Sequence, residues 1–328
     1  MLRTALCELL GIDVPIILAP MGSATSAEFA ACVSNLGALG SIGTLNRTTA
    51  AIKRDINVVR ELTNRNYAVN HIPQMLDNEA FRYTLEARPA VISFALGDPS
   101  DLVRQAHSVG ANVMLQVTTV GQAIQAAERG ADVIIAQGGE AGGYSGNIST
   151  MTLVPQVVDA VSPIPVVAAG GIFDGRGFAA ALMLGAAGIN LGTRFLASNE
   201  APIQGEWKKA IIGANSEDTI KLEVLNDIRP LPGTAGYGTV LRSLHTPFTD
   251  KWVAQRDEAR RDRDRLWAEI ASKVQAGQGH EVLLTAGQTA GGIREVLPVA
   301  EIIRRMIIEA EAAISNTQVR LSERDDGK

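Results

Sequence analysis

Cysteine is scarce in this chain: Cys7 and Cys32 are the only two among 328 residues. Neither belongs to a CxxC motif or to a Cys/His cluster with metal-ligand spacing, so the sequence excludes a disulfide framework and a cysteine-based metal site. Both residues are expected to be ordinary free thiols, and no metal is expected.

The chain also lacks an excess of positive charge and a long apolar run. Lysine and arginine number 30 against 35 aspartates and glutamates, which gives a formal net charge of -5. This balance excludes the basic patch of a nucleic-acid-binding protein and favours a small-molecule ligand. No stretch reaches the roughly 18 uncharged apolar residues of a membrane helix, and the first residues do not resemble a signal peptide. The sequence predicts a cytoplasmic protein with no membrane partner, and it leaves a monomer and a homo-oligomer both open.

Aromatic residues make up only 4% of the chain, although hydrophobic residues make up 46%. Alanine, valine, isoleucine, leucine and glycine must therefore form most of the core. Such small and β-branched side chains suit parallel strands that are buried on both faces and covered by helices.

Short apolar runs alternate with segments of helical periodicity. The eight expected strands are Pro15–Pro20, Ala38–Gly43, Tyr67–Asn70, Val91–Leu96, Asn112–Val117, Val133–Gly138, Pro165–Gly170 and Gly188–Thr193. The helical segments include Ser26–Leu36, Ala50–Thr63, Pro99–Ser108, Val120–Arg129, Arg176–Leu184 and Val299–Ala313. This alternation can close into a barrel or stay an open doubly wound sheet, and eight evenly spaced repeats favour closure. The sequence thus predicts an α/β fold, a (β/α)₈ TIM barrel.

The pattern changes after the eighth expected strand. From about Ala201 the chain has glycine and proline clusters and then a highly charged segment without strand signals. We interpret residues 201–285 as an inserted, mostly helical subdomain that forms a substrate lid, and residues 1–200 and 286–328 as the barrel. The charges of residues 256–265 alternate in sign at helical spacing, which predicts a solvated helix face.

Glycines follow the last two expected strands. Gly170 and Gly171 end the seventh strand and precede a helix that begins near Asp174, while Gly192 and Thr193 end the eighth. Backbone N–H groups without a neighbouring Cβ, together with a helix N-terminus, can cradle a phosphate, and barrels commonly bind one after these two strands. The alternative is that these glycines only allow helices to pack closely on strands.

Polar groups also stand at the ends of other strands. The loop at Met21 and Gly22 can place backbone groups against a flat ring, and Asn70, Gln116 and Gln137 end otherwise apolar runs. Their side chains could bond the polar edge of a ligand ring. The alternative is that each amide satisfies a local backbone group.

Five motifs carry a resemblance to a known family. They are Ala-Pro-Met-Gly at 19–22, Gln-Gly-Gly-Glu-Ala-Gly-Gly at 137–143, Ala-Ala-Gly-Gly-Ile-Phe-Asp-Gly-Arg-Gly at 168–177, Leu-Gly-Thr-Arg-Phe-Leu at 191–196 and Gly-Gln-Thr-Ala-Gly at 287–291. In order and spacing the chain resembles the nitronate monooxygenases, also called 2-nitropropane dioxygenase-like proteins, and the related FMN-type enoyl-ACP reductases. The likeness extends from Pro15 to about Glu311.

The resemblance implies an FMN across the mouth of the barrel. It implies that Gly170, Gly171, Gly192 and Thr193 hold the phosphate. It further implies that the isoalloxazine and ribityl parts are lined by Met21, Gly22, Asn70, Gln116, Gln137 and Gly142. The expected reaction is oxidation of a nitronate or a similar activated substrate, with oxygen reoxidising the flavin. Two alternatives remain: NAD(P)H-dependent reduction of an enoyl thioester, enone or quinone, and a barrel that binds FMN without catalysis.

One position departs from the family pattern. The loop that usually reads Ala-Gly-Gly-His has Tyr144 in place of the histidine. A phenol with a pKa near 10 is a poor general base at neutral pH but a competent hydrogen-bond donor. We therefore predict Tyr144 to be the catalytic residue as a donor, with a packing role as the alternative. His71, after the third strand, is either close to the site or a solvent-facing loop residue.

Overall fold

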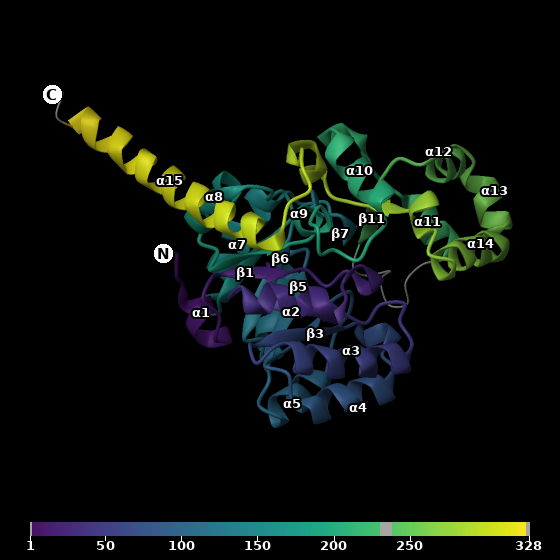
Figure 1. Ribbon diagram of the computed structural model, residues 1–328, viewed down its shortest axis with the longest axis horizontal. Helices are drawn as coiled ribbons and strands as arrows, with labels where there is room; N and C mark the ends of the chain where they lie inside the picture. The colour runs from purple at the N-terminus through teal and green to yellow at the C-terminus, as the bar shows by residue number, and fades with distance from the viewer. Residues whose placement is uncertain (1, 230–237, 326–328) are drawn as a thin grey trace.

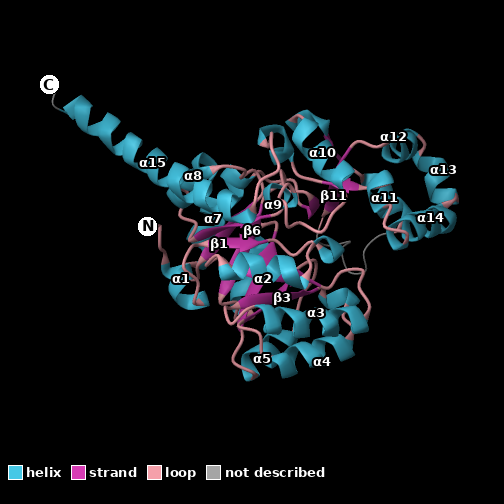
Figure 2. Ribbon diagram, in the orientation of Figure 1, coloured by secondary structure: helices cyan, strands magenta, loops and turns pink. Residues whose placement is uncertain are grey.

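The computed structural model describes residues 2–229 and 238–325, with side chains up to residue 317. Eight parallel strands form its centre (Figure 2), in the order β1-β9-β8-β6-β5-β4-β3-β2. Their bounds are β1 Ile16–Leu18, β2 Gly40–Gly43, β3 Tyr67–His71, β4 Val91–Phe94, β5 Asn112–Val117, β6 Val133–Gln137, β8 Val166–Ala169 and β9 Gly188–Leu191. All eight expected strands are confirmed.

The two ends of this strand order meet through main-chain hydrogen bonds. The N–H of Leu18 in β1 donates to the carbonyl of Leu39, just before β2, and the N–H of Leu39 donates to Ile16, both at 2.9 Å. A parallel bridge also joins Ile17 to Leu39. The sheet is thus a closed barrel, and the predicted TIM barrel is confirmed.

Helices connect successive strands and cover the outside of the barrel (Figure 1). Several begin at a side chain that accepts a bond from a first-turn amide, as N-caps do: Ser26, Thr48, Asp77, Thr119 and Asp174. The helices are α2 Ala27–Asn35, α3 Thr49–Leu62, α4 Asn78–Ala87, α5 Leu102–Ser108, α6 Val120–Glu128, α7 Thr150–Val161 and α8 Gly175–Met183. The helix α15, Val299–Asp325, packs on α8 and then extends beyond the barrel.

Alternate strand residues face the inside and the outside of the barrel. Ile17, Met114 and Val167 belong to the inner cluster, which α1, Ala5–Leu10, closes at the amino-terminal end through Leu6 and Leu10. The outer faces join the helices in a larger cluster. The apolar interior fills the lower barrel and leaves the carboxyl ends of the strands for polar groups.

The described residues between the short helix α9, Thr193–Leu196, and α15 form five α-helices and a small sheet. The helices are α10 Gly205–Gly213, α11 Glu223–Ile228, α12 Pro247–Ala254, α13 Arg256–Arg261 and α14 Arg263–Gln275. The strands β10 Thr219–Lys221, β11 Val240–Leu244 and β12 Leu284–Thr285 are antiparallel, and β11 also pairs with β7, Gly143–Ser145, from the barrel. The charged part is helical, as expected, whereas the short strands of this segment were not anticipated. Part of its glycine and proline cluster, residues 230–237, lies outside the described residues.

The free thiols and the charged run agree with the sequence. Cys7 and Cys32 are both free. The charged run forms α13 and the start of α14, where Arg256 and Arg260 pair with Asp227 of α11 and most other charges are exposed. In the described part of the chain, no helix is both long enough and apolar enough to cross a membrane.

The close packing of α2 on β2 gives a test of the fold. A Cβ added to Gly40 would lie 1.9 Å from the carbonyl oxygen of Ala30. We expect Gly40→Ala to lower the free energy of unfolding by roughly 1–3 kcal/mol, as overpacking does. Urea unfolding would measure the change.

Gly121→Ala in α6 is the control, since no atom lies within 4 Å of its added Cβ. Replacement of a helical glycine by alanine should raise the free energy of unfolding by about 0.5–1 kcal/mol. Equal stability of the two variants would contradict the packing described here.

Candidate active site

Polar side chains gather at the carboxyl end of the barrel. Asn70 at the end of β3 donates from Nδ2 to Ser93 of β4, to its hydroxyl at 3.1 Å and its carbonyl at 3.3 Å. Gln116 of β5 donates from Nε2 to Oε1 of Gln137 of β6 at 3.2 Å. The structure thus brings the three predicted amides onto neighbouring strands of one rim.

Each of these amides bonds a group of an adjacent strand rather than of its own loop. Asn70 and Gln137 are buried, and Gln116 is partly exposed. Strand β9, which β8 separates from β6, contributes Asn190, whose buried Oδ1 has no hydrogen-bond partner among the described residues. A buried acceptor without a partner is unfavourable unless a ligand or water donates to it. The rim therefore fits a ligand with N–H or O–H groups.

The glycine loops after β8 and β9 form a second part of the site. These strands are neighbours, with Ala169 beside Asn190. Gly170 and Gly171 have left-handed φ values of +90° and +75°, which favour glycine. In the described part of the chain, the backbone N–H groups of Gly170, Gly171, Gly192 and Thr193 have no acceptor.

The space beside these glycines differs from one to the next. A Cβ added to Gly171 or Gly192 would make ordinary van der Waals contacts, with Thr150 Oγ1 at 3.6 Å and with Met21 Sδ at 3.4 Å, whereas one added to Gly170 would lie 3.0 Å from Ala141. Thr193 also begins the short helix α9, Thr193–Leu196, directly after the last barrel strand. The unpaired amides of these residues fit a phosphate group.

The N-terminus of α8 does not belong to this cradle, contrary to expectation. Asp174 accepts from Gly177 N at 3.1 Å, and Glu309 of α15 accepts from Gly175 N at 2.9 Å. Two carboxylates thus occupy the amides that were expected to face a phosphate. The sequence reveals Asp174 as a cap but not Glu309, which is more than a hundred residues away.

A carboxylate also lies near the cradle. Glu140 accepts from the N–H of Thr150 at 2.9 and 3.1 Å and from its hydroxyl at 3.0 Å, at the start of α7. Its Oε1 is 3.7 Å from the position of a Cβ on Gly171. Burial lowers the pKa of Lys221 and of Arg242, and Glu140 opposes this effect at both cations. These cations therefore offset the carboxylate.

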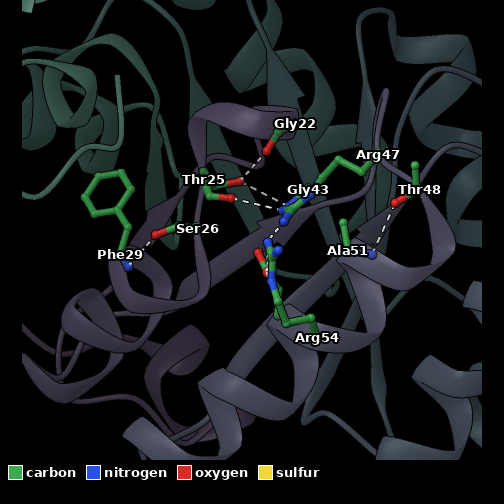
Figure 3. A network of polar contacts seen from close by, with 10 residues as sticks. Gly22, Thr25, Ser26, Phe29, Gly43, Arg47, Thr48, Ala51 and Arg54 are labelled. Carbon is green, nitrogen blue, oxygen red and sulfur yellow. Dashed lines mark hydrogen bonds and ion pairs between the residues drawn. The ribbon is translucent and has the colours of Figure 1, made fainter. Parts of the chain in front are cut away.

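The loop with Met21 and Gly22 is held by the network shown in Figure 3. The Thr25 hydroxyl donates to Gly22 O at 3.0 Å and accepts from Gly43 N at 3.1 Å. The guanidinium of Arg47 donates to Thr25 O at 3.1 Å and Gly43 O at 3.3 Å. Gly22 has a φ of +55°, and a Cβ there would be 2.9 Å from Leu45 O.

Arg47 is itself fixed by an ion pair with Asp55 of α3. Both side chains are less than a tenth exposed, so the pair is screened little by water. Sequence analysis missed these two residues. The signal that could have indicated them is a charged residue at the seventh position of an amphipathic helix, on its otherwise apolar face.

Tyr144 lies in the middle of β7, opposite Leu241 of β11. It packs against Ile72, Ala95 and Leu96 at the barrel rim and against the apolar cluster of the inserted segment. Burial raises the pKa of Tyr144 to about 12, with a smaller opposing effect from Arg229. Its hydroxyl has no hydrogen bond to any described residue. Tyr144 is therefore a packed residue whose neutral O–H stays free to donate.

Gly142 is explained by a close backbone contact. A Cβ there would lie 2.6 Å from Ala286 C and Gly287 N. Gly287 N in turn donates to the Thr193 hydroxyl at 2.9 Å. The loop before Tyr144 thus lies against the segment that leads to α15, and a contact of Gly142 with a cofactor stays a prediction.

Both interpretations of His71 are wrong. Its side chain points outward from β3 into the core, where Nε2 is 3.0 Å from the Thr84 hydroxyl and the ring meets Phe81 edge-on. Burial lowers its pKa to about 4. It lies one residue after Asn70, so strand alternation turns it away from the barrel interior.

The chain is similar in sequence and in structure to several known proteins. The family model described as nitronate monooxygenase matches residues 3–84 and 74–309. A (3aS,4S,5R,7aS)-5-hydroxy-7a-methyl-1-oxo-octahydro-1H-indene-4-carboxyl-CoA dehydrogenase of Rhodococcus jostii (strain RHA1) is 30% identical, over 94% of this chain and 96% of that protein. A probable nitronate monooxygenase of Staphylococcus haemolyticus (strain JCSC1435) is 35% identical, over 67% of this chain and 75% of that protein. The structure of FabK from Thermotoga maritima has a TM-score of 0.88 and 30% identity, over 98% of this chain and 100% of that chain.

The cradle can be tested at Gly171. We expect Gly171→Val to put a side chain beside the unpaired amides and to abolish binding of a flavin phosphate. The measurement is the flavin released per folded protein after purification and reconstitution with FMN.

Backbone strain needs a separate control, because any side chain at Gly171 is strained by its positive φ. Gly110→Val provides one, since Gly110 has a φ of +83° and no atom within 4 Å of an added Cβ. Gly110 lies between α5 and β5, at the opposite end of the barrel. If both variants retain FMN equally, the phosphate does not lie at Gly171.

Proposed function

Because the chain belongs to the nitronate monooxygenase family of oxidoreductases, we propose that it binds FMN at the barrel mouth and exchanges a hydride with an acyl thioester. In this proposal Tyr144 donates a hydrogen bond to the thioester carbonyl. The single observation that carries it is the protonated hydroxyl of the half-buried Tyr144, which has no partner among the described residues.

The residues at the mouth fit FMN. The free amides of Gly170, Gly171, Gly192 and Thr193 would hold its phosphate, and the amides of Asn70, Gln116 and Gln137 would face its polar ring edge. Met21, Gly22 and Gly142 stay predicted lining residues. When bound, FMN supplies the hydride chemistry, and the protein supplies binding, orientation and electrostatics.

Tyr144 would act on the charge that develops on the substrate. Addition of a hydride to the β-carbon of an enoyl thioester places negative charge on the carbonyl oxygen, and in the oxidative direction loss of the α-proton does the same before the hydride leaves. A fixed donor stabilises that charge. A pKa of about 12 keeps the phenol protonated throughout the physiological range. The same pKa excludes a general-base role at neutral pH, so any base would come from elsewhere.

The thioester class is supported by the extent of similarity. The relative named as a CoA dehydrogenase aligns over 94% of this chain, whereas the probable nitronate monooxygenase aligns over 67%. The apolar cluster that Tyr144 shares with α11, α12 and α14 would cover the substrate. NAD(P)H is the proposed electron source if the enzyme works as a reductase.

Nitronate oxidation, with oxygen reoxidising the flavin, is the second candidate. The description of the family model and the 35% identical relative support it. A nitronate is already an anion, so it needs no general base, and Tyr144 could donate to a nitro oxygen. The non-catalytic alternative receives no support from the relatives, which are named as enzymes.

Anaerobic mixing tests the reaction. The FMN-loaded protein is reduced chemically and then mixed with an enoyl-CoA in the absence of oxygen. We expect the yellow absorbance to return, because the enoyl thioester accepts the hydride. In parallel, the oxidised protein is mixed with an alkyl nitronate, NADH or NADPH. If the nitronate bleaches the flavin and no enoyl-CoA reoxidises it, the second candidate is favoured. If the flavin reacts with none of the enoyl-CoA, the nitronate, NADH and NADPH, a non-catalytic barrel is favoured.

The donor role is tested by Tyr144→Phe, which keeps the ring and removes the hydroxyl. We expect kcat/KM to fall by about 100-fold, as when one oxyanion donor is removed. The raised pKa of about 12 has a further consequence: Tyr144 itself should cause no loss of rate with rising pH between about 7 and 10.

Tyr83→Phe is the matched control, since the Tyr83 hydroxyl bonds Asn57 at 2.7 Å on the exposed face of α4. It should leave kcat/KM unchanged. Full activity of Tyr144→Phe would show that the hydroxyl plays no part in the reaction.

A further inference from the structure

The loop that carries Tyr144 is held by a lysine of the inserted segment. The ammonium group of Lys221, at the end of β10, donates to the carbonyls of Ser145 and Gly146 and to Oδ1 of Asn147. The Ser145 contact is 3.2 Å and the Asn147 contact is 2.9 Å. Three acceptors use all three N–H donors of a protonated lysine.

An arginine holds the other end of the same loop. Arg242 of β11 donates from Nε at 3.2 Å and from a terminal nitrogen at 3.1 Å to the carbonyl of Gly139. Its remaining nitrogen donates to the Thr219 hydroxyl of β10 at 3.0 Å. The two cations therefore fix the loop on both sides of Tyr144.

The arrangement of these cations is electrostatically unfavourable. Lys221 and Arg242 stand directly opposite each other on the β10–β11 ladder, and like charges in that position repel. Within the described chain, neither cation lies within ion-pair distance of a carboxylate, and Glu140 acts on them only at longer range. Their partners are carbonyl dipoles of the loop, so an ordinary stabilising ion pair does not explain them.

We propose that Lys221 and Arg242 are positioning residues, which hold residues 139–147 so that the Tyr144 hydroxyl faces the substrate. The inference rests on the proposed function for what Tyr144 does there, but the loop order itself can be measured without any reaction.

The contacts of the Lys221 ammonium group cannot be reproduced by a neutral side chain. A glutamine in its place has two N–H donors for three acceptors, and its own carbonyl oxygen cannot donate to them. The loop should therefore loosen when Lys221 is replaced by glutamine.

The pKa of Lys221 fixes the sign of its pH dependence. Burial, followed by the charge of Arg242, lowers this pKa to about 8, while Glu140 acts in the opposite sense. An open loop or an unfolded chain binds the proton more tightly, so a rise in pH above about 8 favours the closed, folded state. Deprotonation of Lys221 thus does not open the loop.

Hydrogen exchange provides the test. We expect protection of the 139–147 peptide at about pH 7 to be about ten-fold lower in Lys221→Gln than in the unmodified protein, with the α3 peptide unchanged. Lys221→Arg should keep the high protection, because a guanidinium also donates to several acceptors. The rate of anaerobic reoxidation by an enoyl-CoA should follow the same pattern.

Lys208→Gln is the matched control. Burial also lowers the pKa of Lys208, but its ammonium donates to Asn199 O at 3.2 Å and contacts no residue of the loop. Protection in this variant should equal that of the unmodified protein. Loop protection that is the same in Lys221→Gln and the unmodified protein overturns the inference. Lower protection in Lys221→Gln without any thioester reaction supports the positioning and overturns only the proposed function.

Discussion

Closure of the barrel at Leu18 and Leu39 is the constraint on which the site depends. Once these backbone groups pair, all eight strands must point the same way around one ring, and their carboxyl ends share one rim. Asn70, Gln137 and the glycines after β8 and β9 come from distant parts of the chain. They lie close together because each stands at the carboxyl end of a strand of the same ring.

The rim is completed by main chain more than by side chains. Gly142 and Gly287 approach so closely that neither tolerates a Cβ, and β7 adds the Tyr144 loop to the sheet of the inserted segment. Because these contacts join backbone atoms, side-chain rearrangement cannot change them, and they fix the position of the loop. The inserted segment is thus not separate from the barrel, since its strand β11 pairs with β7, which belongs to a barrel loop.

Local patterns predicted the barrel, and tertiary contacts decided the rest. Apolar runs bounded by glycine or proline located all eight strands, and the free amides around Gly171 agree with the predicted cradle. Four features were missed or wrong: the strands of the insertion, the orientation of His71, the capping of α8 by Glu309 and the clamp by Lys221 and Arg242. Each depends on a partner far away in sequence or on strands of two to five residues, which show no periodicity.

The contact between Glu309 and Gly175 has a consequence for the order of assembly. Residues up to about 200 already contain every barrel strand, yet the first turn of α8 finds its second carboxylate, and a backbone surface that only glycine can face, in α15. A growing chain must therefore hold the loop after β8 unfinished while more than a hundred further residues are synthesised. Completion of the first turn of α8 would be a late event in biogenesis, later than formation of the ring that supports it.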